Sequence, residues 1–182
     1  MKIQIFSKEN LNHRIKNGYK HFNSIISIGS PYVQGIQDLD DYFENVLRLQ
    51  FHDINYKSEM PRKDHPKLVR LKDIKKIIRF YEKTKNNTDG YTVHCHAGVH
   101  RSTAAGLILL YLIHNSEKKA IEELLAIHPL PLPNKRMIFL FDKYMKSNLT
   151  EGVLELLKRF KLFLNDEIEI KRDDYLEELP DG

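Results

Sequence analysis

The chain has 182 residues, 41% of them hydrophobic and 30% charged, which predicts one domain with a sizeable core and excludes a disordered chain or a coiled coil. The formal net charge of +4 is small and is typical of a solvated surface. The longest apolar run, residues 103–113, is too short to cross a bilayer, and the N-terminus lacks the apolar core of a secretory signal, so we expect a soluble, cytoplasmic protein. Because Cys95 is the only cysteine, an internal disulfide is excluded.

Four short runs rich in β-branched residues predict strands: "KIQIF" (2–6), "SIISIGS" (24–30), "VLRLQF" (46–51) and "YTVHC" (91–95). The clearest helical pattern covers residues 66–85, where apolar residues recur at three- and four-residue steps and Pro66 suits the first turn. Further helices are expected over residues 101–115, 117–127, 134–145 and 150–164. Strands that alternate with helices, followed by helices alone, predict an α/β fold with a mostly parallel central sheet flanked by helices.

We expect two parts, a main domain over residues 1–149 and a C-terminal helical and acidic extension over residues 150–182 that packs on it. The extension carries an apolar stripe at helical spacing with basic residues among it. Such a helix can bind an anionic membrane, but the acidic residues from Asp166 onward would be repelled by that surface. We therefore predict that the helix packs on its own domain or joins two copies in a homo-oligomer, with no membrane partner.

The stretch "VHCHAGVHRSTAA", residues 93–105, crowds three histidines around the only cysteine. His94 and His96 are two residues apart and would point to opposite sides of a strand, and no carboxylate stands at a helical spacing beside them, so we expect no metal. A buried structural cysteine would not explain why a glycine, an arginine and a serine follow at fixed offsets. No cofactor is expected either.

The chemical interpretation accounts for each of these residues. Cys95 ends a buried strand and Arg101 begins a helix, so the loop between them wraps a concavity at a helix N-terminus, where anions bind. The same positive field favours the thiolate form of Cys95 and makes it a nucleophile. Arg101 offers a planar fork to two phosphoryl oxygens, and Ser102 can donate its hydroxyl group to the sulfur. Gly98 permits backbone angles or a close approach that a Cβ would block. The loop residues expected to surround the anion are His96, Ala97, Gly98, Val99 and His100.

The segment "HCHAGVHRS" resembles the phosphate-binding loop, His-Cys-five residues-Arg-Ser/Thr, of the cysteine-dependent protein tyrosine phosphatases, and "RSTAA" is most similar to the dual-specificity branch. The similarity runs from residue 24 to residue 145, roughly two thirds of the chain. It implies that residues 1–149 form a catalytic domain of this type and that His94 orders the loop through hydrogen bonds and supports thiolate formation. His100 departs from the serine more usual before the arginine, which bears on substrate preference.

Members of this family take the proton for the leaving oxygen from an aspartate on a loop after an earlier strand. Asp53 directly follows a predicted strand, whereas Asp64 lies in a polar loop before the long helix. We favour Asp53, because a strand end positions a side chain over the edge of the sheet more reliably than a loop does, and keep Asp64 as the alternative. Asn134 could orient the attacking water, but a helix N-cap is the favoured interpretation.

The resemblance implies a phosphatase that acts on phosphotyrosine, and also on phosphoserine and phosphothreonine, in proteins through a phosphocysteine intermediate. The alternative is a phosphatase of an inositol phosphate, a phosphoinositide or an RNA 5′ phosphate, which the basic run over residues 56–70 and the extra histidines His96 and His100 favour. A third hypothesis is a non-catalytic phosphate-binding module. The joint presence of Cys95, Arg101 and Ser102 argues against it. The expected partner is a phosphorylated protein or another phosphomonoester, and no nucleic acid.

Overall fold

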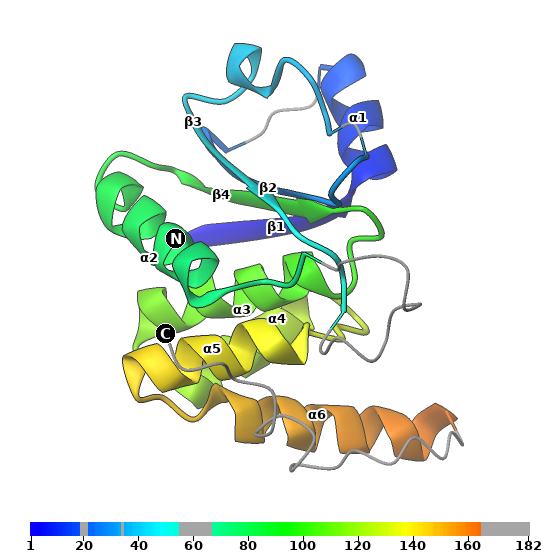
Figure 1. Ribbon diagram of the computed structural model, residues 1–182, viewed down its shortest axis with the longest axis vertical. Coiled ribbons are helices and arrows are strands. Elements are labelled where there is room, and N and C mark those ends of the chain that lie inside the picture. The colour runs from blue at the N-terminus through cyan, green and yellow to red at the C-terminus, as the bar shows by residue number, and fades with distance from the viewer. Residues whose placement is uncertain (19–21, 34, 55–66, 165–182) are drawn as a thin grey trace.

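A parallel β-sheet forms the centre of the molecule (Figure 1). The structure, a computed structural model, describes residues 1–18, 22–33, 35–54 and 67–164, with side chains described up to Lys158. Within these ranges the sheet has the order β1-β4-β2-β3 with every pairing parallel, and its strands are β1 (Lys2–Ser7), β2 (Ser24–Gly29), β3 (Asn45–Gln50) and β4 (Gly90–Cys95). Each lies within one residue of the strand predicted from the sequence, so the expected parallel α/β fold is confirmed.

Helices cover both faces of the sheet. The described residues form α1 (Lys8–Lys16), α2 (Leu71–Thr84), α3 (Arg101–His114), α4 (Glu117–Ile127), α5 (Lys135–Met145) and α6 (Leu149–Leu164), with a short 3-10 turn at Leu39–Asp41. Figure 1 shows α1 on one face, and α3, α4 and α5 on the other, with α6 beyond them. Because successive strand residues point to opposite faces, Ile25 of β2 packs in the cluster that contains α1, while Ile26 and Ile28 enter the main core.

Two helices differ from the prediction. α1 was not expected, and it buries only Leu11 and Ile15; the Ser7 hydroxyl caps it by accepting the Asn10 N–H at 3.1 Å. The long helix begins at Leu71 and not at residue 66 as predicted, because the Asp73 carboxylate accepts the Arg70 N–H at 3.0 Å and caps the helix there. Pro66 itself lies outside the described residues.

The first half of α6 packs against α4 and α5. Asp142 of α5 accepts the backbone N–H groups of Leu149 and Thr150 at 3.0 and 2.6 Å and so caps the start of α6. Behind that cap Leu149, Val153 and Leu156 are buried. The second half of the apolar stripe and the acidic tail lie outside the described side chains, so the domain division and the homo-oligomer stay predictions. None of the helices in the described ranges has the length and apolar character needed to cross a bilayer.

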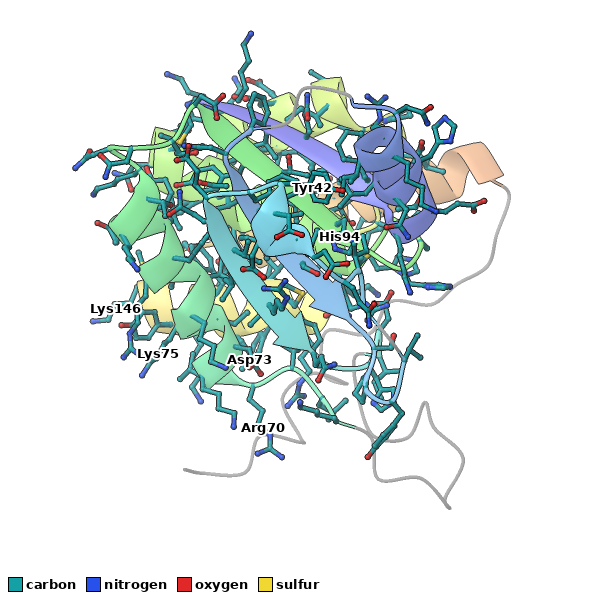
Figure 2. The ribbon with its side chains drawn as sticks, turned by 90° about the horizontal axis from the view of Figure 1, so that it is seen from above. Tyr42, Arg70, Asp73, Lys75, His94 and Lys146 are labelled. Carbon is teal, nitrogen blue, oxygen red and sulfur yellow. The ribbon has the colours of Figure 1, made fainter. Side chains whose placement is uncertain are left out.

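The C-terminal end of β4 is tied to β2 by a buried histidine. The Nε2 atom of His94 lies 2.8 Å from the Ser27 hydroxyl oxygen, and the residue is only 3% exposed. Figure 2 places His94 over the sheet near the end of β4, whereas Lys75 and Lys146 lie at the periphery. Burial lowers the pKa of His94 to about 4. The imidazole is therefore neutral at neutral pH and acts through its hydrogen bond.

We expect α6 to contribute to stability. Deleting residues 150–182 should lower the Tm, because it removes Val153 and Leu156 from the core and uncovers the faces of α4 and α5 that they bury. Val153→Ala alone should lower the free energy of unfolding by about 1–3 kcal/mol in urea titrations, and Lys158→Ala, at an exposed position, by much less. An unchanged Tm after deletion, with salt-sensitive binding of the intact chain to anionic liposomes, would contradict the packing role.

The buried His94 predicts a loss of stability in acid. Its pKa of about 4 in the folded chain lies below the ordinary value of 6.5, so the unfolded chain binds the additional proton as the pH falls below 6.5. The free energy of unfolding should decrease between pH 6.5 and 4, by on the order of 3 kcal/mol from this residue. In urea titrations at a series of pH values, the free energy of unfolding should depend less steeply on pH in His94→Gln than in the wild type. Equal slopes in the two proteins would show that His94 is not the responsible group.

Candidate active site

The loop between β4 and α3 is held against β1. Cys95 is fully buried at the end of β4, and Arg101 is the first residue of α3. Gly98, between them, has a φ of 80°, and a Cβ there would lie 2.6 Å from the Ser7 backbone nitrogen. The Lys8 N–H group donates to the carbonyl oxygen of the loop residue that follows Cys95, at 3.1 Å. The structure thus confirms both reasons for a glycine at position 98, the backbone angle and the close approach.

The far side of the loop is held by α3 and by the segment before α5. The Thr103 hydroxyl donates to the carbonyl oxygens of Val99 and His100. The backbone N–H groups of Leu132 and Asn134 donate to the same two carbonyls at 3.4 and 3.1 Å. The segment "PLPN", residues 131–134, therefore lies beside the loop. Thr103, in the first turn of α3, was not predicted to contact the loop, although its position directly after Ser102 is a signal that could have indicated this.

Two groups contact the sulfur of Cys95. The Gly98 N–H donates to it at 3.2 Å, and the Ser102 hydroxyl oxygen lies 3.2 Å away. Both groups can donate hydrogen bonds to the sulfur, which lies at the N-terminal end of α3. The structure thus brings together three of the predicted site residues, Cys95, Gly98 and Ser102. His96 and Ala97 are exposed on the outer part of the loop.

Arg101 is buried beside the loop, with 3% of its surface exposed. One terminal nitrogen of its guanidinium group donates to the Ser30 hydroxyl at 3.1 Å and to the Phe51 carbonyl oxygen at 2.9 Å. Its Nε atom has no hydrogen-bond partner among the described residues and lies 3.5 Å from Asp53 Oδ2. Ser30 and Phe51 were not predicted as site residues. Each is the last residue of a predicted strand, 24–30 or 46–51, and that position is the signal that could have identified it.

We name Asp53, His100 and Asn134 the acid cluster. His100 Nδ1 lies 3.2 Å from Asp53 Oδ2, and the side-chain amide of Asn134 donates to Asp53 Oδ1 at 3.2 Å. Asn134 also caps α5 by accepting the Met137 N–H at 3.1 Å, so the predicted cap is confirmed and has a second contact. The structure brings Asp53 to the loop, while Asp64 lies outside the described residues. The catalytic role of each residue stays a prediction.

Opposite charges within the acid cluster shift two pKa values. Burial acts to raise the pKa of Asp53, but the hydrogen bond from His100 and the charges of Arg101 and His100 outweigh it, and this pKa lies below its ordinary value. The hydrogen bond to Asp53 raises the pKa of His100 above its ordinary value, although burial opposes the shift. Near neutral pH, Asp53 is therefore an anion, and its charge favours the protonated form of His100.

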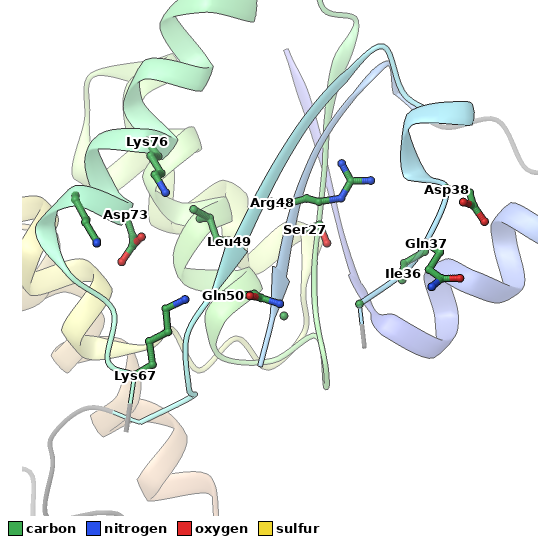
Figure 3. Close-up of a pocket in the computed structure, with 13 residues that line it drawn as sticks. Ser27, Ile36, Gln37, Asp38, Arg48, Leu49, Gln50, Lys67, Asp73 and Lys76 are labelled. Atoms are coloured by element: carbon green, nitrogen blue, oxygen red, sulfur yellow. The ribbon is translucent and has the colours of Figure 1, made fainter. Parts of the chain in front are cut away.

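Two hollows in the described part of the structure are lined by several basic residues. One, of about 860 Å³, is lined by residues of β2 and β3 and, on one side, by Lys67 and Lys76 (Figure 3). Lys72 also lines it. The other, of about 710 Å³, adjoins the loop itself. It is lined by Ser7, Lys8, Glu9, Asn12, His13, Lys16, His96 and Ala97. Of the basic run expected over residues 56–70, only Lys67 and Arg70 lie within the described ranges.

No family model and no curated protein sequence matches this chain. Solved structures do match it. Human DUSP28 superposes with a TM-score of 0.53 at 17% identity, over 79% of this chain and 91% of that one. DUSP15 gives a TM-score of 0.52 at 19% identity, over 86% and 91%. PTPMT1 in complex with PI(5)P gives 0.50 at 16% identity, over 87% and 94%.

These similarities concern the fold, since the sequence identities are low. They extend over most of each chain, 79% and 86% of this one for DUSP28 and DUSP15. The architecture expected from the short motif is thus found across most of the chain. It follows that the chain has the α/β fold of the cysteine-dependent protein tyrosine phosphatases, in its dual-specificity form.

Proposed function

We propose that the chain is a phosphatase that hydrolyses phosphomonoesters, with phosphotyrosine and phosphoserine or phosphothreonine in proteins as its substrates, through a phosphocysteine intermediate. The observation that carries this proposal is the buried Cys95 sulfur, which has the Gly98 N–H and the Ser102 hydroxyl at 3.2 Å at the N-terminal end of α3. A nucleophilic thiolate at a helix N-terminus suits attack on an anionic phosphoryl group, because the helix attracts the group while the sulfur attacks it.

In the first step, the Cys95 thiolate attacks phosphorus, an S–P bond forms and the ester P–O bond breaks. Arg101 holds the phosphoryl oxygens. Its Nε lacks a hydrogen-bond partner among the described residues, and a buried donor of this kind is satisfied when an anion binds. The acid cluster lies on the Arg101 side of the loop and supplies the proton to the leaving oxygen.

In the second step, water attacks phosphorus and the S–P bond breaks. The Ser102 hydroxyl donates a hydrogen bond to the departing thiolate, which makes the sulfur a better leaving group. The acid cluster accepts the proton from the attacking water, so the site returns to its starting protonation state. Every charge that these steps require is provided by the loop, Arg101 and the acid cluster.

The nucleophile and the guanidinium can be tested together. Cys95→Ser should abolish hydrolysis of p-nitrophenyl phosphate while the protein still binds inorganic phosphate, because the loop remains folded. Arg101→Lys should lower kcat/KM by about two orders of magnitude or more, since an ammonium group cannot make the two-pronged contact. Arg79→Lys, at an exposed position on α2, is the matched control and should leave activity unchanged. Normal turnover by Cys95→Ser would end the covalent mechanism, and activity that EDTA abolishes and a divalent ion restores would favour a metal mechanism.

A second candidate function, dephosphorylation of a polyanionic phosphomonoester, is favoured by the hollow that adjoins the loop. The basic side chains of Lys8, His13 and Lys16 line it together with His96. Positive charge beside the loop suits a substrate with additional phosphates, such as an inositol phosphate or a phosphoinositide. PTPMT1, which shares the fold, has been solved in complex with PI(5)P.

A substrate panel separates the candidates. We expect the highest kcat/KM on phosphotyrosine peptides, lower values on phosphoserine and phosphothreonine peptides, and low values on inositol phosphates, phosphoinositides and 5′-phosphorylated RNA. If the second candidate is correct, inositol phosphates will exceed the peptides, and Lys16→Gln will reduce their kcat/KM by about tenfold without affecting p-nitrophenyl phosphate. No turnover of any substrate, with phosphate binding retained, would identify a non-catalytic binding module.

A further inference from the structure

We infer that His100, the loop residue before Arg101, is the group that gives its proton to the leaving oxygen, and that Asp53 positions His100. This inference rests on the proposed phosphatase activity and names the donor within the acid cluster. It departs from the expectation that Asp53 itself is the acid. The contacts of the carboxylate, the exposure of the two side chains and the position of His100 in the loop support it.

Among the residues that the structure describes, every group in contact with the Asp53 carboxylate is a hydrogen-bond donor or a cation. Oδ1 accepts from the Asn134 amide, and Oδ2 faces His100 Nδ1 at 3.2 Å and Arg101 Nε at 3.5 Å. A proton on either oxygen would point at one of these donors and break its hydrogen bond or ion pair. It would also remove the negative charge that balances the buried guanidinium of Arg101. The surroundings of Asp53 therefore favour the carboxylate, which is the form that has no proton to give.

His100 is placed to hold the proton instead. With Nδ1–H directed at Asp53, the other ring nitrogen, Nε2, lies on the opposite side of the imidazole and has no partner among the residues that the structure describes. The His100 side chain is 48% exposed, against 22% for Asp53, so His100 is the more accessible of the two. Its backbone is held by the Asn134 N–H and the Thr103 hydroxyl, which restricts where the ring can lie. An Asp-His pair of this kind fixes the ring orientation and stabilises the imidazolium.

The charges around His100 agree with this assignment. Asp53, after β3, raises its pKa, while burial and the neighbouring Arg101 lower it; the balance lies above the ordinary histidine value. His52 stands directly before Asp53, but its Nδ1 accepts the Lys67 N–H at 3.0 Å and does not take part in the pair. Near neutral pH, His100 is thus the member of the acid cluster that carries a transferable proton.

The proton balance is closed within the site. As the ester P–O bond breaks and the S–P bond to Cys95 forms, Nε2–H of His100 gives its proton to the leaving oxygen, and the imidazole becomes neutral. In the second step, neutral Nε2 takes a proton from the attacking water while the new O–P bond forms and the S–P bond breaks. Cys95 leaves as a thiolate and His100 is again an imidazolium, so no further reactant is required.

The dependence on the leaving group tests the donor. His100→Gln should lower the rate of the first chemical step on phenyl phosphate by about two to three orders of magnitude, and on dinitrophenyl phosphate, whose leaving group needs no proton, by less than about tenfold. His52→Gln is the matched control and should keep the wild-type dependence on the leaving group. Inorganic phosphate binding and the Tm of each variant report whether the loop is still folded.

The pH dependence of kcat separates His100 from Asp53. In the wild type the rate should fall as the pH rises through the raised pKa of His100, above 6.5, because the donor loses its proton. This basic limb should disappear in His100→Gln and move to lower pH in Asp53→Asn, which keeps the imidazole but removes the charge that raises its pKa. NMR titration of the His100 ring in the wild type and in Asp53→Asn measures the same shift without any substitution of His100.

Two results would overturn the inference while leaving the proposed function intact. One is a wild-type phosphatase whose basic limb persists in His100→Gln and vanishes in Asp53→Asn, which makes Asp53 the donor. The other is a leaving-group effect found in Asp64→Asn and absent from both His100→Gln and Asp53→Asn. A wild-type protein that hydrolyses no aryl phosphate, in contrast, contradicts the proposed function itself.

Discussion

The close contact between Gly98 and the backbone of β1 is the constraint on which the site depends. The loop turns back through a φ of 80° that only glycine adopts at little cost, and a side chain there would collide with the Ser7 nitrogen at 2.6 Å. This approach directs the Gly98 N–H at the sulfur of Cys95. Because α3 starts immediately after the turn, the same contact also decides where Arg101 enters the site. The proposed nucleophile Cys95, the Gly98 N–H that donates to its sulfur and the guanidinium of Arg101 are thus positioned by one backbone contact.

Charge balance gives the site its second constraint. A guanidinium with 3% exposure is costly to bury unless anions or carbonyl oxygens surround it. Here the Phe51 carbonyl and the Asp53 carboxylate supply that balance, at 2.9 and 3.5 Å. Asp53 therefore serves the stability of Arg101 as well as the orientation of His100, and a group that must stay charged to balance a cation is poorly suited to carry a proton. The stability of the site and the assignment of its proton donor have the same electrostatic origin.

The elements that could be predicted are those whose pattern is local. The four strands and the helices from α3 to α6 were placed to within about one residue, because their apolar periodicity and their caps are visible in short windows. α1 was missed because its two buried residues, Leu11 and Ile15, stand among polar neighbours and gain their stability from Ile25, Leu39 and Phe43, which lie elsewhere in the chain. The start of α2 was predicted five residues too early, because the capping effect of Asp73 was overlooked.

The residues of the candidate site also differ in whether the sequence alone could predict them. The sequence by itself determined the loop: Cys95, Gly98, Arg101 and Ser102 stand at spacings that a strand, a tight turn and a helix bring together in one loop. The tertiary structure alone decided what surrounds it. Asp53 contacts His100, 47 positions away in the chain, because the strand order β1-β4-β2-β3 places the ends of β3 and β4 at one edge of the sheet. It contacts Asn134, 81 positions away, because the segment before α5 packs on the loop. No local pattern encodes that order, because it results from the packing of the whole core; hence the residues of the loop were visible in the sequence, and the partnership of His100 with Asp53 was not.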